Sequence, residues 1–265
     1  AIFSGALFLS VIIEIMASRT RVVENEVRVR TEELTLANKK LVELNDLKNK
    51  FLGMASHDLR NPLASIRGYS RFLLDKGSQV KEDTRQEFLT TIKNVSGNML
   101  ELISNLLDIS VIESGQLKLN LEKASMEKLA EEKIHLQQIL ADKKNFRLHA
   151  DFDEVPEFYF DANRIGQVVD NLLSNAVKYS PPDKEVFVRL EAHEQTMTLS
   201  VKDEGPGIDP DEQWQLFQHF QKLSARPTAG ESSSGLGLAI AQRIVEEHQG
   251  SIGVDSQLGQ GATFH

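Results

Sequence analysis

Apolar residues in the first part of the chain are spaced alternately four and three positions apart. No proline or glycine interrupts residues 6–52. Such spacing over many turns is typical of a coiled coil, because it places one apolar stripe along a helix. We call this stripe the seam. Twelve of its fifteen positions are apolar: Ile2, Ala6, Leu9, Ile13, Met16, Thr20, Val23, Val27, Arg30, Leu34, Ala37, Leu41, Leu44, Lys48 and Phe51. The pattern predicts a long helix that pairs along the seam.

After Phe51 the seam shifts by one stutter and continues to Leu73, and a polar segment with a glycine breaks it at residues 75–82. A second helix follows, with apolar residues again four and three apart from Phe88 to Ile109, and ends near Gly115. Two such helices joined by a short turn form a helical hairpin. One hairpin cannot cover both its apolar faces, so we expect two chains to form a four-helix bundle. The alternative is a monomeric hairpin packed on the rest of the chain.

The second half of the chain alternates strand and helix patterns. Strands are predicted near residues 117–121, 146–152, 157–160, 186–190 and 197–201. Helices are predicted at residues 126–142, at 161–178 and in a last segment that ends near Gly250. This order predicts a mixed sheet with helices on one face. The expected fold is therefore multidomain: a long α-helical coiled coil and a dimeric four-helix bundle, followed by an α+β sandwich.

Composition agrees with a folded chain of 265 residues, 40% of them hydrophobic and 26% charged. The net charge of −9 argues against a general nucleic-acid binder. The absence of cysteine excludes disulfides, thiolate zinc sites and cysteine nucleophiles, and it fits a reducing compartment. These numbers describe an acidic, intracellular protein.

Residues 1–16 depart from that description, because Glu14 is their single charged residue. The run is shorter than the roughly 20 residues that a spanning helix needs. The chain does not open on methionine, however, and Arg19 and Arg21 follow at once, as on the cytoplasmic flank of a membrane helix. Two interpretations stay open for residues 1–18: the end of a transmembrane helix, or a helix buried in protein or in a dimer.

His57 lies two residues from the nearest seam position on either side, which is about 200° around the helix, so we expect it to face water. Asp58 adjoins it and could orient the imidazole or accept its proton. Asn61 lies four residues on, on the same face, and Pro62 should kink the helix. An exposed histidine is usually only a surface residue. With these neighbours, the sequence supports a functional role for His57 about as well as it supports an ordinary surface position.

Polar residues also cluster on the helix predicted at residues 161–178. Asn171, Asn175 and Lys178 follow one another at helical spacing. Amide oxygens can ligate Mg²⁺, and a lysine can bind a phosphate. By itself the pattern is more often the polar face of an exposed helix.

Glycines accompany two further clusters. Asp203 opens a turn with Gly205, Gly207 and Ile208, where a carboxylate can accept a hydrogen bond from an amine and glycines let a ligand come close. Alone, this is a turn. Residues 232–240 contain Gly235 and lead into a helix, whose free N–H groups form an anion site. The chain has neither a Walker A loop nor a Rossmann glycine motif. The intervening residues 209–234 predict an apolar clip followed by a mobile lid over a ligand.

Together these clusters resemble a known family. Residues 51–63 resemble the H box of sensor histidine kinases, and the later clusters resemble, in order, the N, G1, F and G2 boxes of their GHKL ATP-binding catalytic domain. The resemblance covers roughly residues 45–265. It implies that His57 accepts the γ-phosphoryl group of ATP, with Asp58 as its acid/base partner. Asn61 would position water for a phosphatase-type reverse reaction. The family more often has glutamate at the position of Asp58.

The resemblance also implies a nucleotide site. Mg²⁺ would be held through Asn175, and Asp203 would bind the adenine amine. Lys222 and Arg226 are candidate lid cations for the γ-phosphate, although the family often has arginine nearer Phe220, where this chain has Gln221. The remaining candidates contact phosphates or line the pocket: Asn171, Lys178, Tyr179, Gly205, Gly207, Ile208, Phe217, Phe220, Ser234, Gly235, Leu236, Gly237 and Leu238.

The expected domains are an apolar segment at residues 1–18, a coiled coil at 19–50, a phosphotransfer hairpin at 51–115 and a catalytic domain at 116–265 that is truncated at its end. The resemblance implies a homodimeric kinase that phosphorylates His57 from Mg·ATP and passes the phosphoryl group to an aspartate of a response regulator receiver domain. The chain would be the cytoplasmic portion of an inner or plasma membrane protein. The alternatives are an ATP-binding signalling scaffold and a GHKL ATPase that does not phosphorylate itself.

Overall fold

The computed structural model describes residues 2–115, 117–141, 146–193, 196–218, 221, 223–228 and 235–265, and it leaves out some helical side chains, including those of residues 2–15. The chain forms two compact units, residues 1–60 and 61–265. The candidate residues Phe220, Lys222 and Ser234 lie outside the described residues.

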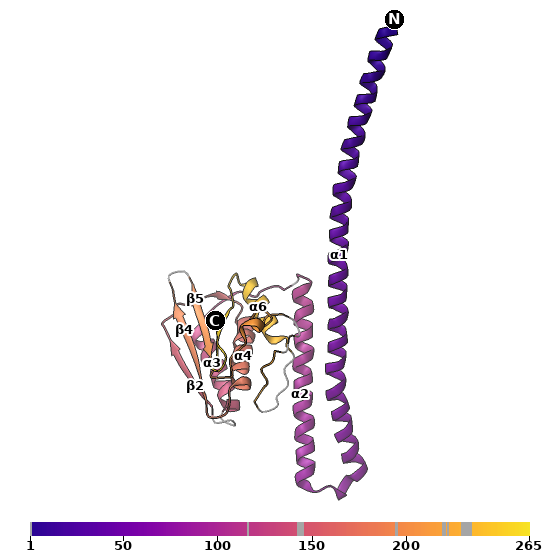
Figure 1. Cartoon of the computed structure of the whole chain (residues 1–265). Helices are drawn as coiled ribbons and strands as arrows, with labels where there is room; N and C mark the ends of the chain where they lie inside the picture. The colour runs from indigo at the N-terminus through magenta and orange to yellow at the C-terminus, as the bar shows by residue number, and fades with distance from the viewer. Residues whose placement is uncertain are drawn as a thin grey trace. The chain divides into compact units, whose positions relative to one another are not determined.

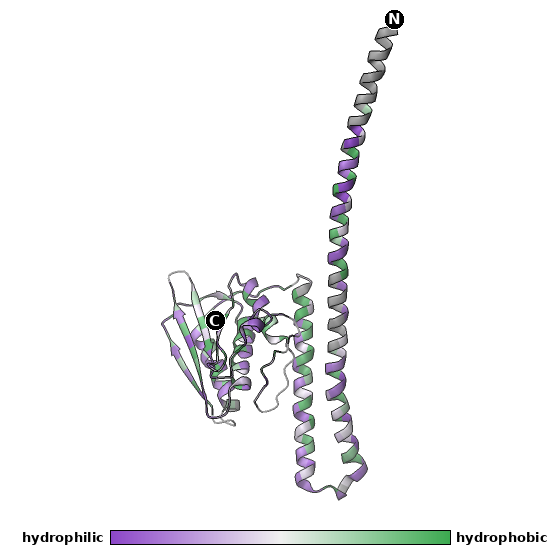
Figure 2. Cartoon of the chain, in the orientation of Figure 1, coloured by the Kyte–Doolittle hydropathy of each residue, from purple (hydrophilic) through white to green (hydrophobic). Residues whose placement is uncertain are grey.

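The first unit is the amino-terminal part of helix α1 (Ile2–Lys76). Its described seam side chains are exposed in the single chain, with Leu34 at 69% and Leu41 at 64%. In Figure 2 apolar and polar residues alternate along the described part of this helix. The predicted long helix is confirmed. The pairing along its seam, and the apolar segment at residues 1–18, stay predictions.

The second unit begins with the end of α1, which stays helical through Pro62. A 3-10 turn (Gly77–Gln79) joins α1 to α2 (Glu82–Glu113), as Figure 1 shows. The ring centroid of Phe88 lies 4.8 Å from that of Tyr69 and 5.3 Å from that of Phe72. These contacts hold α1 and α2 together, which confirms the predicted helical hairpin.

Helix α2 also carries apolar side chains outside the hairpin. Leu100, Ile103 and Leu107 follow one another at helical spacing and are all exposed. Among the described residues, α2 is the one helix long and apolar enough to cross a membrane by length and composition. A helix of a soluble bundle meets the same test when two of its faces are apolar, one packed within the hairpin and the other packed on a partner.

The remaining residues of this unit form a mixed sheet covered by helices. The five strands are ordered β2-β4-β5-β7-β6; β2 and β4 are parallel and the other pairs antiparallel. Their bounds are β2 (Arg147–Phe152), β4 (Glu185–Ala192), β5 (Met197–Lys202), β6 (Val254–Ser256) and β7 (Ala262–Phe264). The predicted mixed sheet is confirmed.

A strand predicted at residues 117–121 is absent. The structure instead has β1 (Glu122–Ala124), paired with β3 (Phe158–Phe160). The alternating leucines of this segment suggested a strand, but β3 is three residues long and offers hydrogen-bonding partners to residues 122–124 alone. Strand formation needs a neighbour, and the alternation of side chains cannot supply one.

Helices α3 (Met126–Ala141), α4 (Ala162–Tyr179) and α6 (Gly237–Glu247) lie together on one side of the sheet (Figure 1). The core contains Val188 and Leu190 of β4 and Leu173 of α4, all of which are fully buried. Along β4 the side chains alternate between this core and the open face, which follows from the two-residue period of a strand.

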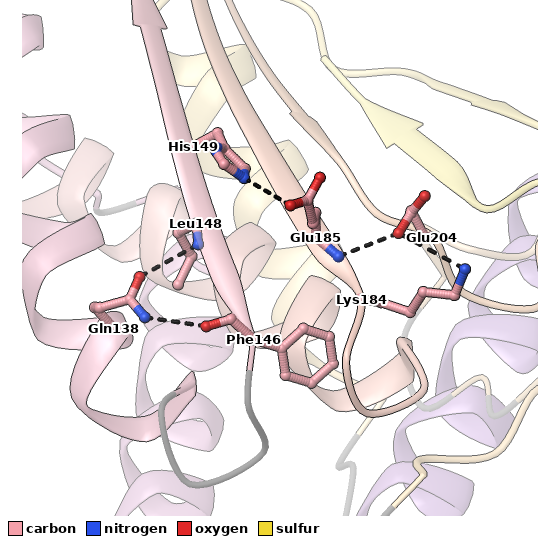
Figure 3. A network of polar contacts seen from close by, with 7 residues as sticks. All are labelled: Gln138, Phe146, Leu148, His149, Lys184, Glu185 and Glu204. Carbon is pink, nitrogen blue, oxygen red and sulfur yellow. Dashed lines mark hydrogen bonds and ion pairs between the residues drawn. The ribbon is translucent and has the colours of Figure 1, made fainter.

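Gln138 of α3 covers part of the sheet edge at β2. Its Nε2 donates to Phe146 O at 3.1 Å, and its Oε1 accepts from Leu148 N at 3.2 Å, so the side-chain amide takes the place of a neighbouring strand (Figure 3). Across the strands, His149 Nε2 lies 3.2 Å from Glu185 Oε1 on the open face. Covering an edge strand protects it from pairing with other chains.

Candidate functional site

His57 is an exposed position of α1, as predicted, with 68% of its side chain accessible. Its Nδ1 lies 3.1 Å from Asp58 Oδ1. An ionised carboxylate only accepts hydrogen bonds, so this contact places the imidazole proton on Nδ1 and a lone pair on Nε2. The arrangement suits a nucleophile at Nε2, with the Asp58 carboxylate as the acceptor for the proton on Nδ1.

Asn61 lies one helical turn further along α1 and is also exposed. Its carbonyl accepts a hydrogen bond from Ser65 Oγ at 3.2 Å. Pro62 lacks the N–H that would bond the carbonyl of Asp58, four residues earlier. The predicted kink at Pro62 stays a prediction.

Asp203 lies just after β5 and is 5% exposed. Its Oδ1 accepts hydrogen bonds from Gly205 N at 2.8 Å and Ala262 N at 3.3 Å. Burial raises the pKa of this carboxyl above its ordinary value, and the two backbone N–H groups offset part of that shift. These hydrogen bonds orient the carboxylate through Oδ1, and Oδ2 receives no hydrogen bond from the described residues.

Close packing explains the glycines around Asp203. A Cβ at Gly205 would lie 2.8 Å from Asp203 Oδ1 and 3.1 Å from Tyr179 O, so no larger residue fits between them. A Cβ at Gly207, which has φ +72°, would lie 2.0 Å from Gln257 O. These candidate nucleotide residues are thus already required by the fold. Ile208, at the end of the turn, is buried.

Helix α4 carries the asparagine cluster. Its N-cap residue is Asp161, whose Oδ1 accepts from Arg164 N at 3.0 Å. One turn before Asn175, Asn171 donates from Nδ2 to Gly237 O at 3.1 Å. This contact joins the predicted N and G2 clusters, which lie far apart in the sequence. Asn175 is half-buried, and its side chain has no hydrogen bond among the described residues.

The carboxyl end of α4 holds part of the predicted lid. Thr228 N donates to Lys178 O at 2.9 Å, and Thr228 Oγ1 donates to Ser180 O at 3.0 Å. Sequence reasoning missed Thr228, because a threonine in a loose polar segment carries no signal. Arg226, two residues earlier, is exposed and has no ion pair within the described chain.

The other candidates flank these residues. Leu236 is the fully buried N-cap residue of α6, and Gly235 and Leu238 beside it are half-buried. Phe217 is half-buried and follows α5 (Pro210–Gln213) in the predicted clip. The structure therefore gathers the described N, G1 and G2 candidates in one unit.

Comparison with known families agrees with this arrangement. Residues 47–115 match the His Kinase A (phospho-acceptor) domain, and residues 160–265 match the histidine kinase-, DNA gyrase B- and HSP90-like ATPase. The chain belongs to the histidine kinases. The predicted family is thereby confirmed, and so is the predicted order of a helical region followed by a GHKL-type sheet domain.

Relatives of this histidine kinase include the circadian input-output histidine kinase CikA of Synechococcus elongatus, 36% identical over 94% of this chain and 33% of that protein. The solved histidine kinase AdeS of Acinetobacter baumannii is 26% identical, with a TM-score of 0.61 over 78% of this chain and 94% of that chain. Full-length ShkA in complex with AMPPNP has the same score and identity, over 79% of this chain and 43% of that chain. The chain spans about a third of the length of the curated relatives it matches.

Proposed function

We propose that this histidine kinase transfers the γ-phosphoryl group of ATP to His57 and then to an aspartate of a response regulator. The observation that carries the proposal is the 3.1 Å contact between His57 Nδ1 and Asp58 Oδ1, at a water-facing position of a phospho-acceptor type of domain. A proton on Nδ1 leaves Nε2 as the nucleophile.

In the first step, the lone pair of His57 Nε2 attacks the γ-phosphorus. The N–P bond forms as the bond from phosphorus to the β,γ-bridging oxygen breaks, and ADP leaves with that oxygen. Bond formation makes the Nδ1 proton acidic, and Asp58 accepts it, which leaves a neutral phosphorylated imidazole ring. Positioning and charge neutralisation supply most of the catalysis in such transfers.

The nucleotide would bind between α4, α6 and the Asp203 turn. Asp203 Oδ2 accepts from the adenine amine, while Asn171, Lys178 and the turn at Gly235 and Gly237 contact phosphates. The remaining candidates of the G1, F and G2 clusters line the pocket. The AMPPNP complex of ShkA supports a nucleotide at this type of domain. Arg226 is the described candidate for a lid cation.

Mg²⁺ fits the residues of this site. The described residues contain no group of three or more His, Cys, Asp or Glu side chains that could hold a metal. The ion would instead be held by the amide oxygen of Asn175 together with ATP phosphates, which are the oxygen ligands that Mg²⁺ prefers. When bound, it neutralises phosphate charge.

The exposed apolar positions of α1 and α2 support a dimeric assembly. We propose a homodimer in which Leu100, Ile103 and Leu107 of α2 pack against a second copy and the seam at residues 19–50 forms a coiled coil. The hairpin would span residues 51–115 and the catalytic domain 116–265. The apolar run at residues 1–18 would attach the protein to a membrane, with the remainder in the cytoplasm. Asn61 would position water for phosphatase activity.

Chemical stability of the label tests the proposed function. After incubation with radiolabelled ATP and Mg²⁺, we expect the chain to carry label that acid removes and base does not, because the N–P bond of phosphohistidine is labile in acid. Acid-stable label would contradict the proposal. ATP binding without label would support a scaffold, and phosphate release without label would support an ATPase.

Replacing Asp203 with asparagine is expected to weaken ATP binding about 100-fold, because a carboxylate acceptor becomes an amide that presents N–H to the adenine amine. The amide oxygen can still accept from Gly205 N and Ala262 N, so the fold should persist. Isothermal titration calorimetry measures the change. Unchanged affinity would remove Asp203 from the site.

The same variant should stabilise the fold at neutral pH. Burial raises the pKa of Asp203 in the folded chain, so that between its ordinary value of 3.8 and the raised value the folded state holds more protons than the unfolded state. The contribution of Asp203 to the free energy of unfolding therefore falls as pH rises through that window, and the ionised form is destabilising above it. Thermal melts from pH 4 to pH 8 should show this pH dependence in the wild type and its loss in Asp203→Asn.

A further inference from the structure

Strand β2 is an edge strand of the five-stranded sheet. It pairs with β4 on one side, and no described strand pairs with its other side. Just past the strand, Asp153 N donates to Leu190 O of β4 at 2.9 Å, so odd-numbered residues turn their backbone groups toward β4. Successive residues of a strand turn these groups to opposite edges. The even-numbered residues of β2 therefore present their N–H and C=O groups to the free edge.

The side chain of Gln138 already occupies part of this free edge. It bonds Phe146 O and Leu148 N, as Figure 3 shows. Beyond it, the free edge offers the C=O of Leu148, both backbone groups of Ala150 and the N–H of Phe152. These groups have no hydrogen-bonding partner among the described residues. The open stretch is short and is centred on Ala150.

The side chain of Ala150 shows that this part of the edge is accessible. It lies on the helix-covered face of the sheet, because it pairs with the buried Val188. Ala150 is nevertheless exposed, whereas Leu148 and Phe152 on the same face are half-buried. A second strand can therefore approach β2 at Ala150.

The charges around Ala150 are complementary to those of an antiparallel copy of the same strand. A copy centred on Ala150 places Arg147 opposite Asp153 and His149 opposite Asp151. The side chain of Asp151 is 82% exposed, so it can meet a partner. Opposite charges directly across antiparallel strands stabilise the pairing, and like charges oppose it. A parallel copy in register would instead place each charge opposite itself.

The backbone and the apolar side chains fit the same register. The C=O of Leu148 accepts from the N–H of Phe152 in the second copy, and the two Ala150 residues exchange both of their bonds. This pairing uses the groups that Gln138 leaves open. On the helix-covered face, Leu148 lies opposite Phe152, which joins two half-buried apolar side chains.

We propose that β2 pairs with β2 of a second copy, antiparallel about Ala150, and joins two sheet domains into one continuous sheet. The interface is isologous, because both chains contribute the same residues. It uses none of the α1 and α2 residues assigned to the homodimer, so it links homodimers into larger assemblies. A short edge buries little area, so the association is weak. The inference depends neither on ATP binding nor on phosphotransfer.

The absence of cysteine allows a direct test by crosslinking. Ala150→Cys introduces a single thiol, and the two substituted positions face each other with Cα atoms about 5.5 Å apart, within the range of a disulfide. Mild oxidation of the full chain should therefore give a crosslinked pair on a non-reducing gel. Ala192→Cys is the matched control, because Ala192 is an exposed alanine of the adjacent strand β4, and it should stay uncrosslinked. Equal crosslinking of the two variants, or none at Ala150, would overturn the pairing.

An exchange of charges tests the register. In the Ala150→Cys chain, Arg147→Asp should lower the crosslinked fraction about tenfold, because two like-charged pairs replace two attractive ones. Adding Asp153→Arg should restore crosslinking, because opposite charges then face each other again. A folded double variant that stays uncrosslinked would overturn the antiparallel register. The fluorescence of Trp214 during urea unfolding shows whether each variant is folded.

A proline at the centre of the edge gives an independent measurement. The N–H of Ala150 points away from β4, so Ala150→Pro keeps the sheet of its own chain and removes a donor from the free edge. In sedimentation experiments, the wild-type chain should form species larger than a dimer as its concentration rises, and the proline variant should not. Identical sedimentation of the two chains would contradict the proposal.

Discussion

Replacing His57 with glutamine is expected to abolish acid-labile labelling of the chain completely while leaving ATP affinity within about twofold of the wild type. Glutamine keeps a polar side chain on an exposed helical position but offers no ring nitrogen to attack phosphorus. Because the nucleotide contacts proposed above lie on α4, α6 and the Asp203 turn, binding should not change. Radiolabelled ATP measures the labelling, and calorimetry measures the affinity.

His149 provides a matched control for His57. It is also an exposed histidine beside a carboxylate, with its Nε2 3.2 Å from Glu185 Oε1, but it lies on the open face of the sheet. His149→Gln should retain full labelling. If both variants keep their label, the acceptor is another residue. If both lose it, the loss does not identify His57 as the acceptor.

Replacing Gly261 with alanine should destabilise the sheet domain by about 4 kcal/mol, through strain and steric overlap together. Gly261 has φ +81°, a conformation that side chains rarely adopt, and its Cβ would lie 2.0 Å from the carbonyl oxygen of Asp203. The backbone there must shift, and with it the bond from Ala262 N to the carboxylate. Urea unfolding followed by the fluorescence of Trp214, the single tryptophan of the chain, measures the loss.

The substitution Gly259→Ala separates backbone strain from steric overlap. Gly259 has a similar φ of +80°, but apart from its chain neighbours no atom of the described residues lies within 4 Å of a Cβ built there. Gly259→Ala should therefore cost about 1–2 kcal/mol, from backbone conformation alone. Equal costs at the two glycines would show that the contact with Asp203 contributes nothing, and that the glycine is needed only for its backbone angle.

Periodic elements were predictable from sequence because their side chains repeat at a spacing that the backbone sets. The spacing of four and three predicted α1 and α2 with their turn, and alternation predicted β4 and β5. The same reasoning failed at residues 117–121, where the leucines alternate but pair with no strand in the described part of the chain. Local pattern describes which way side chains point and says nothing about which segment lies opposite.

For the candidate site, too, some features were predictable from sequence and others depended on the tertiary structure. Sequence alone supplied the residue types and their order: a water-facing His57 beside a carboxylate, asparagines one turn apart on a helix, and glycines after Asp203. Tertiary structure decided which of these residues touch. It joined Asn171 to Gly237 and set Thr228 on the end of α4. It also buried the Ser180 hydroxyl, which has no hydrogen-bonding partner among the described residues. These contacts join residues distant in sequence, and such contacts form only when the packing of the whole core brings their elements together.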